Sequence, residues 1–250
     1  MEAIVGNTGL IGKTLLRQTT FSHHYNSSNI HDIEGRDFDL VVCSGMRAEK
    51  WIANKYPNKD LENLTSIKSN LKTISADLII LISTVDVFAN PIDVDEDTMI
   101  DTTNLETYGL NRYDLENFVK KNFNKYLIVR LAGLVGKNLK KNFLFDLKNN
   151  NNLDQFNSES TFQFYVLNNL WNDIKVALNN NLRLIHLTSE PLSVVEICEK
   201  INFDKTKFDE NTKKVNYDFK TKYKHFYKSQ IDYTYDKNYV LNEIKDYINL

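Results

Sequence analysis

The sequence has few cysteines and no long apolar run, and these two features exclude several classes of protein. Its 250 residues include only two cysteines, Cys43 and Cys198, which are too few for a disulfide framework. Neither has histidine or cysteine partners at the spacing of a zinc site, so we expect no metal and a reducing compartment. No stretch approaches the roughly 20 apolar residues that cross a bilayer, and the N-terminus lacks the basic residues of a signal peptide. We therefore expect a cytoplasmic protein without a membrane segment.

The chain also lacks an excess of charge of either sign. It carries 31 basic and 33 acidic residues, a formal net charge of −2, so there is no overall basic surface for a phosphate backbone. Only residues 211–228, NTKKVNYDFKTKYKHFYK, concentrate lysines between aromatic residues. A nucleic-acid site there is the alternative to a solvated surface, and we prefer the solvated surface. We expect no nucleic-acid partner.

Apolar residues alternate between strand and helix patterns in the first half of the chain. With 42% apolar and 26% charged residues the composition is that of an ordinary globular protein. The patterns predict strands at 3–5, 39–45, 77–84 and 125–136, with helices at 10–19, 63–74 and 108–122. Strands that alternate with helices predict an α/β protein with a doubly wound parallel sheet.

The pattern loosens after residue 136. It predicts strands at 162–166 and 182–188, and helices at 142–149, 168–180, 191–201 and 236–248. Residues 148–157, KNNNNLDQFN, are expected to form a loop. The length of the chain allows one domain with a smaller lobe from its C-terminal part.

Glycines recur at every third residue between the first strand and the first helix. The segment is Gly6, Asn7, Thr8, Gly9, Leu10, Ile11 and Gly12. A diphosphate that sits against backbone N–H groups at a helix N-terminus needs this spacing, because a Cβ atom would hold it away. The alternative is a tight turn with close helix packing. We interpret the segment as a dinucleotide-binding turn.

The end of the second strand bears on the choice of cofactor. In such sites an acid about twenty residues after the glycines binds the adenosine ribose. If the strand ends near Tyr25 or Asn26, that acid is missing and Asn26, Ser27 and Ser28 take its place, whereas a longer strand would make Asp32 the acid. A missing carboxylate removes a repulsion against a 2′-phosphate, which favours NADP over NAD.

Hydroxyl groups follow the strand at 77–84 and open the helix at 108–122. Ser83 and Thr84 end the strand, where open α/β sheets bind ligands, and Tyr108 lies one helical turn before Arg112. Reduction of a carbonyl needs a proton for the new alkoxide. A tyrosine supplies and recovers it near neutrality only if a cation stabilises the phenolate. The alternative is an exposed tyrosine beside a solvated arginine.

Four motifs in this order resemble the extended short-chain dehydrogenase/reductases, also called NAD-dependent epimerase/dehydratases: GNTGLIG, LISTVDVF, YGLNR and VRLAGLVG. The resemblance covers about residues 3–202. It implies a Rossmann-type sheet that binds NAD or NADP in about residues 1–136, and a small C-terminal α/β substrate lobe from 137–250, all in one domain over 1–250. It also implies a nucleotide-activated sugar as substrate.

The resemblance assigns roles to single residues. It implies that Thr84 polarises the substrate carbonyl and that Tyr108 is the acid/base. The resemblance also implies contacts with the cofactor and the substrate. The adenosine side of the cofactor would contact Cys43, Ser44 and Gly45, and its nicotinamide would contact Gly133, Leu134 and Val135. The diphosphate of the substrate would contact Asn142.

The sequence departs from the family at the cation and at one carboxylate. Arg112 stands where the family has lysine; it keeps the charge but offers a wider, planar fork. Family dehydratases carry Thr-Asp-Glu where this chain has Thr84, Val85 and Asp86, which argues against dehydration. We include Ser83, Asp86 and Arg47 among the substrate-binding candidates; Arg47 could grip a phosphate or form a surface salt bridge. Trp51 and Trp171 are expected to pack rather than to stack on a ligand.

The sequence therefore predicts an NAD(P)-dependent oxidoreductase that reduces a keto group of a nucleotide-activated sugar. One alternative is an epimerase that uses the same site. The other is a catalytically inactive dinucleotide-binding regulator, with Arg112 as the trace of lost activity. A homodimer that pairs through the helix at 108–122 is also possible.

Overall fold

A parallel β-sheet flanked by helices organises the computed structural model, which describes all 250 residues. The six strands are, in spatial order, β10 (Leu184–Leu187), β6 (Tyr126–Leu131), β4 (Ser75–Thr84), β3 (Asp37–Cys43), β1 (Glu2–Val5) and β2 (His23–Tyr25). β1 pairs in parallel with both β2 and β3, and β3 pairs in parallel with β4. The order confirms the predicted α/β fold with a Rossmann-type doubly wound sheet.

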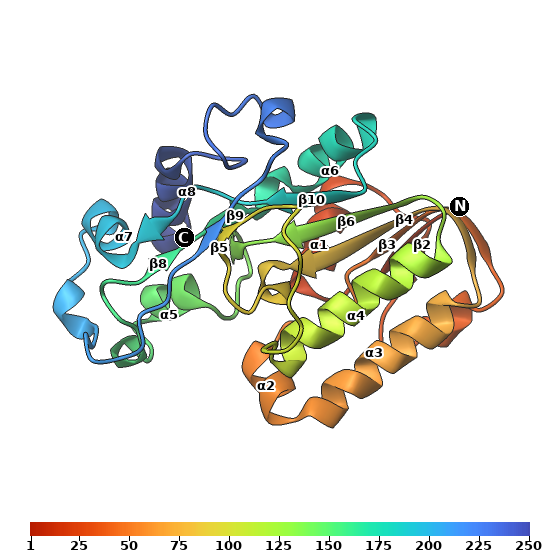
Figure 1. Ribbon diagram of the computed structural model, residues 1–250, viewed down its shortest axis with the longest axis horizontal. Helices are drawn as coiled ribbons and strands as arrows, with labels where there is room; N and C mark the ends of the chain where they lie inside the picture. The colour runs from red at the N-terminus through yellow and green to blue at the C-terminus, as the bar shows by residue number, and fades with distance from the viewer. The chain divides into compact units, whose positions relative to one another are not determined.

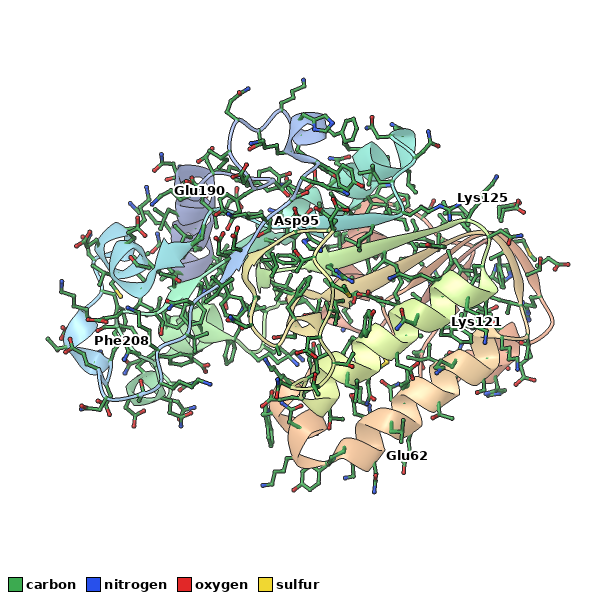
Figure 2. All side chains as sticks on the ribbon, in the orientation of Figure 1. Glu62, Asp95, Lys121, Lys125, Glu190 and Phe208 are labelled. Atoms are coloured by element: carbon green, nitrogen blue, oxygen red, sulfur yellow. The ribbon has the colours of Figure 1, made fainter.

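Helices cover both faces of this sheet. They are α1 (Leu10–Gln18), α2 (Lys50–Lys55), α3 (Pro57–Leu71), α4 (Thr107–Asn122) and α6 (Leu170–Asn179). α3 and α4 run side by side over one face, and α1 and α6 lie on the other (Figure 1). Charged side chains such as Glu62 on α3 and Lys121 on α4 point outwards from these helices (Figure 2). None of the helices combines the length and the apolar composition that crossing a bilayer requires.

A buried ion pair fastens α4 to the sheet. Glu116 of α4 and Arg130 of β6 are almost fully buried, with 2.7 Å between Arg130 Nη2 and Glu116 Oε2 and 2.9 Å between Arg130 Nε and Glu116 Oε1. The hydroxyl of Ser83 donates to Glu116 Oε1 at 2.6 Å. The carboxylate is thus satisfied by two side chains of the sheet, as a buried charge requires.

The chain divides into two compact units, each built from several segments. The first comprises Met1–Ala89, Met99–Arg130 and Leu170–Ile185, and the second comprises Asn90–Thr98, Leu131–Asn169 and His186–Leu250. Small two-stranded sheets form in the second unit: β7 (Gly133–Val135) with β9 (Phe164–Val166), β8 (Thr161–Phe162) with β11 (Leu192–Ser193), and β5 (Ile92–Val94) with β12 (Asp218–Phe219). Its helices are α5 (Phe143–Asn149), α7 (Val194–Ile201) and α8 (Lys237–Asn249).

Several expected elements differ from those observed. The strand predicted at 162–166 is two strands, β8 and β9, in different sheets, and the loop predicted at 148–157 contains the end of α5 and a short helix, η3 (Leu153–Gln155). The strand predicted at 125–136 is two strands, β6 and β7, because the backbone breaks at Ala132 and β7 pairs with β9 instead of joining the large sheet. The helix predicted at 191–201 starts as strand β11, and α7 begins only after Ser193, which forms a capping box with Glu196. The helix predicted at 63–74 starts earlier, at Pro57, and a separate helix, α2, precedes it.

The two tryptophans behave differently. Trp171 packs edge-on against Phe21, with ring centroids 6.1 Å apart, as expected. The expectation for Trp51 is wrong, because 65% of this residue is exposed on α2. Its neighbours in α2 face α3 and α4, so the helix turns Trp51 outwards.

The lysine-rich segment 211–228 lies in the second unit and is neutralised by carboxylates. Four of its lysines form ion pairs: Lys214 with Glu159, Lys220 with Asp93, Lys222 with Asp97 and Lys224 with Asp232. These pairs agree with the interpretation of the segment as an ordinary solvated surface.

Candidate active site

Two glycines of the turn after β1 are required by close backbone packing. Gly6 has a φ of +91°, and a Cβ atom on it would lie 2.5 Å from the carbonyl oxygen of Ser44. A Cβ on Gly12 would lie 2.1 Å from the carbonyl oxygen of Gly6. No larger residue fits either position without moving backbone. Part of the glycine pattern therefore serves the tight turn and helix packing.

Gly9 has no such packing role. The only atom that a Cβ on Gly9 would meet is the carbonyl oxygen of Gly6, at an ordinary 3.4 Å. Gly9 is the N-cap of α1 and provides no side-chain cap, and the first turn of α1 has no acidic residue. The N–H groups of that turn therefore face outwards without intrahelical partners. The space in front of Gly9 suits an anion held by backbone N–H groups.

Asn7 adds an unsatisfied polar atom to the same turn. Its Oδ1 atom is buried and has no hydrogen-bond partner. A buried acceptor without a partner is unusual, and a ligand hydroxyl would satisfy it. The open space at Gly9 fits a diphosphate, and dinucleotide binding at this turn stays a prediction.

The second strand ends without an acid. β2 ends at Tyr25, and Asn26 follows, with its Oδ1 accepting from Ser28 N at 2.9 Å and from Ser28 Oγ at 2.6 Å. Asp32 lies beyond the strand in the short helix η1 (Ile30–Ile33), 3.2 Å from His31. Of the two alternatives for this region, the structure thus has the one in which the strand-end carboxylate is missing.

The end of β3 packs against the glycine turn. Ser44 donates through both its N–H and its hydroxyl to the carbonyl oxygen of Val5, at 2.8 and 3.1 Å. Cys43 is fully buried, and burial raises the pKa of its thiol to about 11. Its side chain belongs to the core under the sheet, so only its backbone can line a ligand site. The adenosine contacts expected for Cys43, Ser44 and Gly45 stay a prediction.

Tyr108 presents a buried ring and an unpartnered hydroxyl. It lies in the first turn of α4 with 9% of the residue exposed. Its N–H donates to Asn54 Oδ1 at 2.9 Å, whereas its hydroxyl makes no hydrogen bond within the chain. Burial raises the pKa of Tyr108 to about 12, and the nearby guanidinium of Arg112 acts in the opposite direction. At neutral pH this phenol is protonated and free to donate to a ligand.

The start of α4 lies directly against the segment after β4. Thr84 is the last residue of β4, and the short helix η2 (Val85–Val87) follows it. A Cβ on Gly109 would lie 2.0 Å from the carbonyl oxygen of Asp86, so only glycine allows this approach. The close contact brings Tyr108 to the carboxyl end of β4, where Thr84 lies.

Arg112 is held under the ring of Tyr108 by buried contacts. Its guanidinium carbon lies 3.7 Å from the centre of the Tyr108 ring. It forms an ion pair with Asp60 of α3, and it donates to the carbonyl oxygens of Tyr108, at 3.1 Å, and of Arg47. Only 4% of its side chain and 3% of that of Asp60 are exposed. The alternative of a solvated arginine is therefore wrong, and the guanidinium ties α4 to α3 and to the loop after β3.

A second ion pair lies beside Thr84. Thr84 Oγ1 donates to Asp86 Oδ2 and accepts from Asp86 N, both at 3.2 Å. Lys50 of α2 donates to Asp86 Oδ1 at 2.7 Å. About 46% of the Lys50 side chain and 20% of the Asp86 side chain are exposed. The pair is therefore accessible, unlike that of Arg112.

Two substrate-binding candidates differ in their surroundings. Ser83 points away from Thr84, because successive residues of a strand alternate between faces, and its hydroxyl is committed to buried Glu116. The side chain of Arg47 is exposed and forms no ion pair within the chain, so its alternative of a surface salt bridge is not realised. Phosphate binding by Arg47 stays a prediction.

The remaining candidates lie in the second unit. Gly133, Leu134 and Val135 form β7, and a Cβ on Gly133 would lie 2.8 Å from the carbonyl oxygen of Gln163. Asn142 is the N-cap of α5: its Oδ1 accepts from Phe145 N at 3.1 Å, and its Nδ2 donates to the carbonyl oxygen of Leu134 at 2.8 Å. The contacts expected for these residues with nicotinamide and diphosphate stay predictions.

Three residues around Tyr108 were not singled out in the sequence. They are Lys50 and Asn54 of α2 and Asp60 of α3. Lys50 and Asn54 are four residues apart, a spacing that places both on one face of a helix. Their partners lie between 36 and 54 residues away, so no local pattern revealed the contacts.

Solved structures with similar folds cover nearly the whole chain. A dTDP-4-dehydrorhamnose reductase from Bacillus anthracis in complex with NADP matches with a TM-score of 0.73 and 16% identity, over 99% of this chain and 97% of its own. A UDP-glucuronic acid 4-epimerase from Bacillus cereus in complex with NAD matches with a TM-score of 0.71 and 17% identity, over 100% of this chain and 99% of its own. An NAD-dependent NDP-hexosamine 5,6-dehydratase involved in tunicamycin biosynthesis matches with a TM-score of 0.77 and 13% identity, over 99% of this chain and 96% of its own.

These matches settle the fold. The chain shares its fold with these reductase, epimerase and dehydratase structures. No protein-family model and no curated protein matches the sequence. The resemblance read from the four motifs is confirmed at the level of the fold, which reductases and epimerases of nucleotide sugars share. At 12–17% identity the matches do not distinguish between these activities.

Proposed function

We propose that the protein is an NAD(P)-dependent oxidoreductase that reduces a keto group of a nucleotide-activated sugar. A nicotinamide dinucleotide bound at the glycine turn would supply the hydride. Tyr108 then gives its proton to the carbonyl oxygen, and Thr84, whose hydroxyl donates to Asp86 Oδ2 in the free protein, gives up that bond to donate to the same oxygen. The observation that carries the proposal is the unpartnered hydroxyl of the buried Tyr108 at the carboxyl end of β4.

The protonation state of the phenol bears on its proposed role as the acid. Burial holds the pKa of Tyr108 at about 12, so the proton is present at neutral pH. A protonated phenol serves as the acid that reduction needs, whereas oxidation of an alcohol needs the phenolate as base. An ordinary tyrosine is protonated at neutral pH as well, so the raised pKa does not by itself favour reduction, and the expected stabilisation of the phenolate by a cation does not outweigh burial in the free protein.

NADP is the proposed cofactor, with NAD as the alternative. Asn26, Ser27 and Ser28 follow β2 where a carboxylate would otherwise repel a 2′-phosphate. Fluorescence titration with NADPH and with NADH checks this preference. Tighter binding of NADH would reverse it.

Tyr108→Phe tests the reaction. We expect it to abolish NADPH oxidation with a 4-keto sugar nucleotide while NADPH binding is retained, because only the proton donor is removed. Tyr113→Phe on the same helix is the matched control and should leave turnover unchanged. Unchanged turnover in Tyr108→Phe would exclude Tyr108 as the acid.

A dinucleotide-binding protein without catalysis is the second candidate. It is favoured by one observation, the commitment of Arg112 to Asp60 and to two backbone carbonyls, which leaves the guanidinium fixed under the ring. This candidate predicts that NADPH binds but that neither the natural protein nor Arg112→Lys turns over a keto sugar nucleotide. Turnover by the natural protein would reject it.

A further inference from the structure

Two ion pairs flank Tyr108, and they differ in accessibility. The pair of Arg112 with Asp60 is buried, with at most 4% of either side chain exposed. The pair of Lys50 with Asp86 is 46% and 20% exposed. Exposed pairs open and exchange partners readily, whereas buried pairs are held by the cost of an unpaired charge.

Arg112 is poorly placed to adjust the charge at the phenol. Its guanidinium lies over the face of the ring, and its donors are directed at Asp60 and at two backbone carbonyl oxygens. The positive charge at residue 112 is therefore present but fixed.

Lys50 reaches the same site from α2. Lys50 and Asn54 lie one helical turn apart on one face of α2. Asn54 Oδ1 accepts the N–H of Tyr108 at 2.9 Å, and Lys50 Nζ donates to Asp86 Oδ1 at 2.7 Å. The backbone of Asp86 in turn packs against Gly109, next to Tyr108. α2 thus fixes both the start of α4 and the carboxylate beside it.

We propose that Lys50 supplies an adjustable positive charge at Tyr108 and that Asp86, its ion-pair partner, opposes it. Lys50 acts through Tyr108 and is therefore a positioning residue. Its importance for catalysis rests on the proposed function, but the electrostatic effect itself exists without any ligand.

Four charged groups act on the phenol besides burial, which is the largest influence and raises the pKa of Tyr108. Arg112 has the largest effect of the charges and lowers the pKa; Asp86 then raises it, Lys50 lowers it and Asp60 raises it. Arg112 and Asp60 form a buried ion pair that is fixed in place. Lys50 and Asp86 remain as the two accessible charges of opposite effect.

The test measures the ionisation of residue 108 directly. Tyr108 is replaced by a ring-difluorinated tyrosine, whose phenol is intrinsically more acidic, and its fluorine resonance is followed as the pH is raised without cofactor or substrate. The same titration is made with Lys50→Met, Asp86→Asn and, as control, Lys55→Met. Lys55 is on the same helix, but its ammonium lies over the ring of Tyr56.

Opposite shifts are the expected result. Lys50→Met should raise the midpoint on the order of one pH unit, and Asp86→Asn should lower it by a similar amount. Lys50→Arg should restore the natural midpoint, and Lys55→Met should leave it unchanged. General damage to the fold would move both variants in the same direction. Unchanged midpoints, or shifts of equal sign, would overturn the proposal.

Turnover measured on the same variants separates this inference from the proposed function. Opposite shifts without any turnover would uphold the role of Lys50 and reject the reductase. Turnover without shifts of the midpoint would uphold the reductase and reject the role of Lys50. If the difluorinated protein does not fold, monofluorotyrosine at every tyrosine reports the same midpoint, with Tyr108→Phe identifying the resonance.

Discussion

Tyr108 shows how burial and an unpaired hydroxyl combine at a single residue. The ring of Tyr108 is buried, but its hydroxyl is not one of the buried polar atoms that lack a partner, so the oxygen keeps access to solvent. It makes no hydrogen bond within the chain, and an arginine stacks on the face of the ring. The hydroxyl is therefore open to a ligand that accepts its proton or hydrogen bond.

The raised pKa of Tyr108 predicts a loss of stability at high pH. The pKa is about 12 in the folded protein, above the ordinary value of 10, so the neutral form is favoured by folding. The contribution is fully present below pH 10 and is lost as the pH rises through 12. It amounts to roughly 3 kcal/mol. Urea unfolding at stepped pH values should show this loss in the natural protein and a smaller loss in Tyr108→Phe.

The comparison with Tyr108→Phe removes the other alkaline effects. Burial also raises the pKa of Tyr25, Tyr233 and Tyr247, but these tyrosines are present in both proteins. An equal loss of stability in both proteins between pH 10 and 12 would show that Tyr108 ionises normally.

At the scale of elements, two glycines of the turn after β1 have different roles: Gly12 is needed for packing, and Gly9 is proposed to leave space for the diphosphate. Gly12→Ala should lower the free energy of unfolding by roughly 1–3 kcal/mol, because its Cβ would meet the carbonyl oxygen of Gly6. Gly9→Ala should lower stability less than Gly12→Ala, because Gly9 has an extended backbone (φ −73°) and open space beside it, so that only the weaker N-cap preference of alanine acts. It should nevertheless weaken NADPH binding, since the methyl group occupies the diphosphate position. Thermal unfolding and fluorescence titration measure the two effects, and unchanged NADPH affinity in Gly9→Ala would place the dinucleotide elsewhere.

Arg112 holds α3, α4 and the loop after β3 together. Arg112→Met leaves the buried carboxylate of Asp60 without its cation and should cost about 3–5 kcal/mol of stability. Arg112→Lys keeps the charge, but an ammonium group cannot make all the hydrogen bonds of the guanidinium group. It should lower the free energy of unfolding by roughly 1.5–3 kcal/mol. Chemical denaturation gives these values. A lysine variant as stable as the natural protein would mean that the guanidinium contacts contribute little.

Local patterns predicted the elements well where a single chain segment carries the signal. The strands at 77–84 and 182–188 and the helix at 108–122 lie within two residues of their observed bounds. The break at Ala132 was missed because the apolar run continues across it. β7 leaves the large sheet to pair with β9, about 30 residues later, and no local periodicity records such a pairing.

At the scale of the whole molecule, the units interleave along the chain. The segment Asn90–Thr98 belongs to the second unit, where Glu96 accepts from Thr221 Oγ1 at 2.7 Å, Lys222 N at 2.9 Å and His186 N at 2.8 Å. These partners are 90 to 126 residues away from Glu96. A division near residue 136 could be proposed from the sequence, but the crossing segments could not, because only tertiary contacts define them.

The same limit applied to the candidate site. Gly9, Thr84 and Tyr108 could be predicted as site residues from the order of the motifs, because each lies at a recognisable turn or at the end of a helix or strand. The pairing of Arg112 with Asp60 and of Lys50 with Asp86 could not be predicted, since each partner comes from a different helix or loop. The charges that surround Tyr108 emerge only from the packing of α2, α3 and α4.

Transfer of deuterium from NADPH labelled at the nicotinamide C4 position tests the central claim most directly. With a 4-keto sugar nucleotide as substrate, the natural protein should yield an alcohol that carries one deuterium on the former carbonyl carbon, detected by mass spectrometry. Tyr108→Phe should yield none. A protein that binds the labelled NADPH and the sugar nucleotide, yet returns the substrate unlabelled and unreduced, would contradict the account.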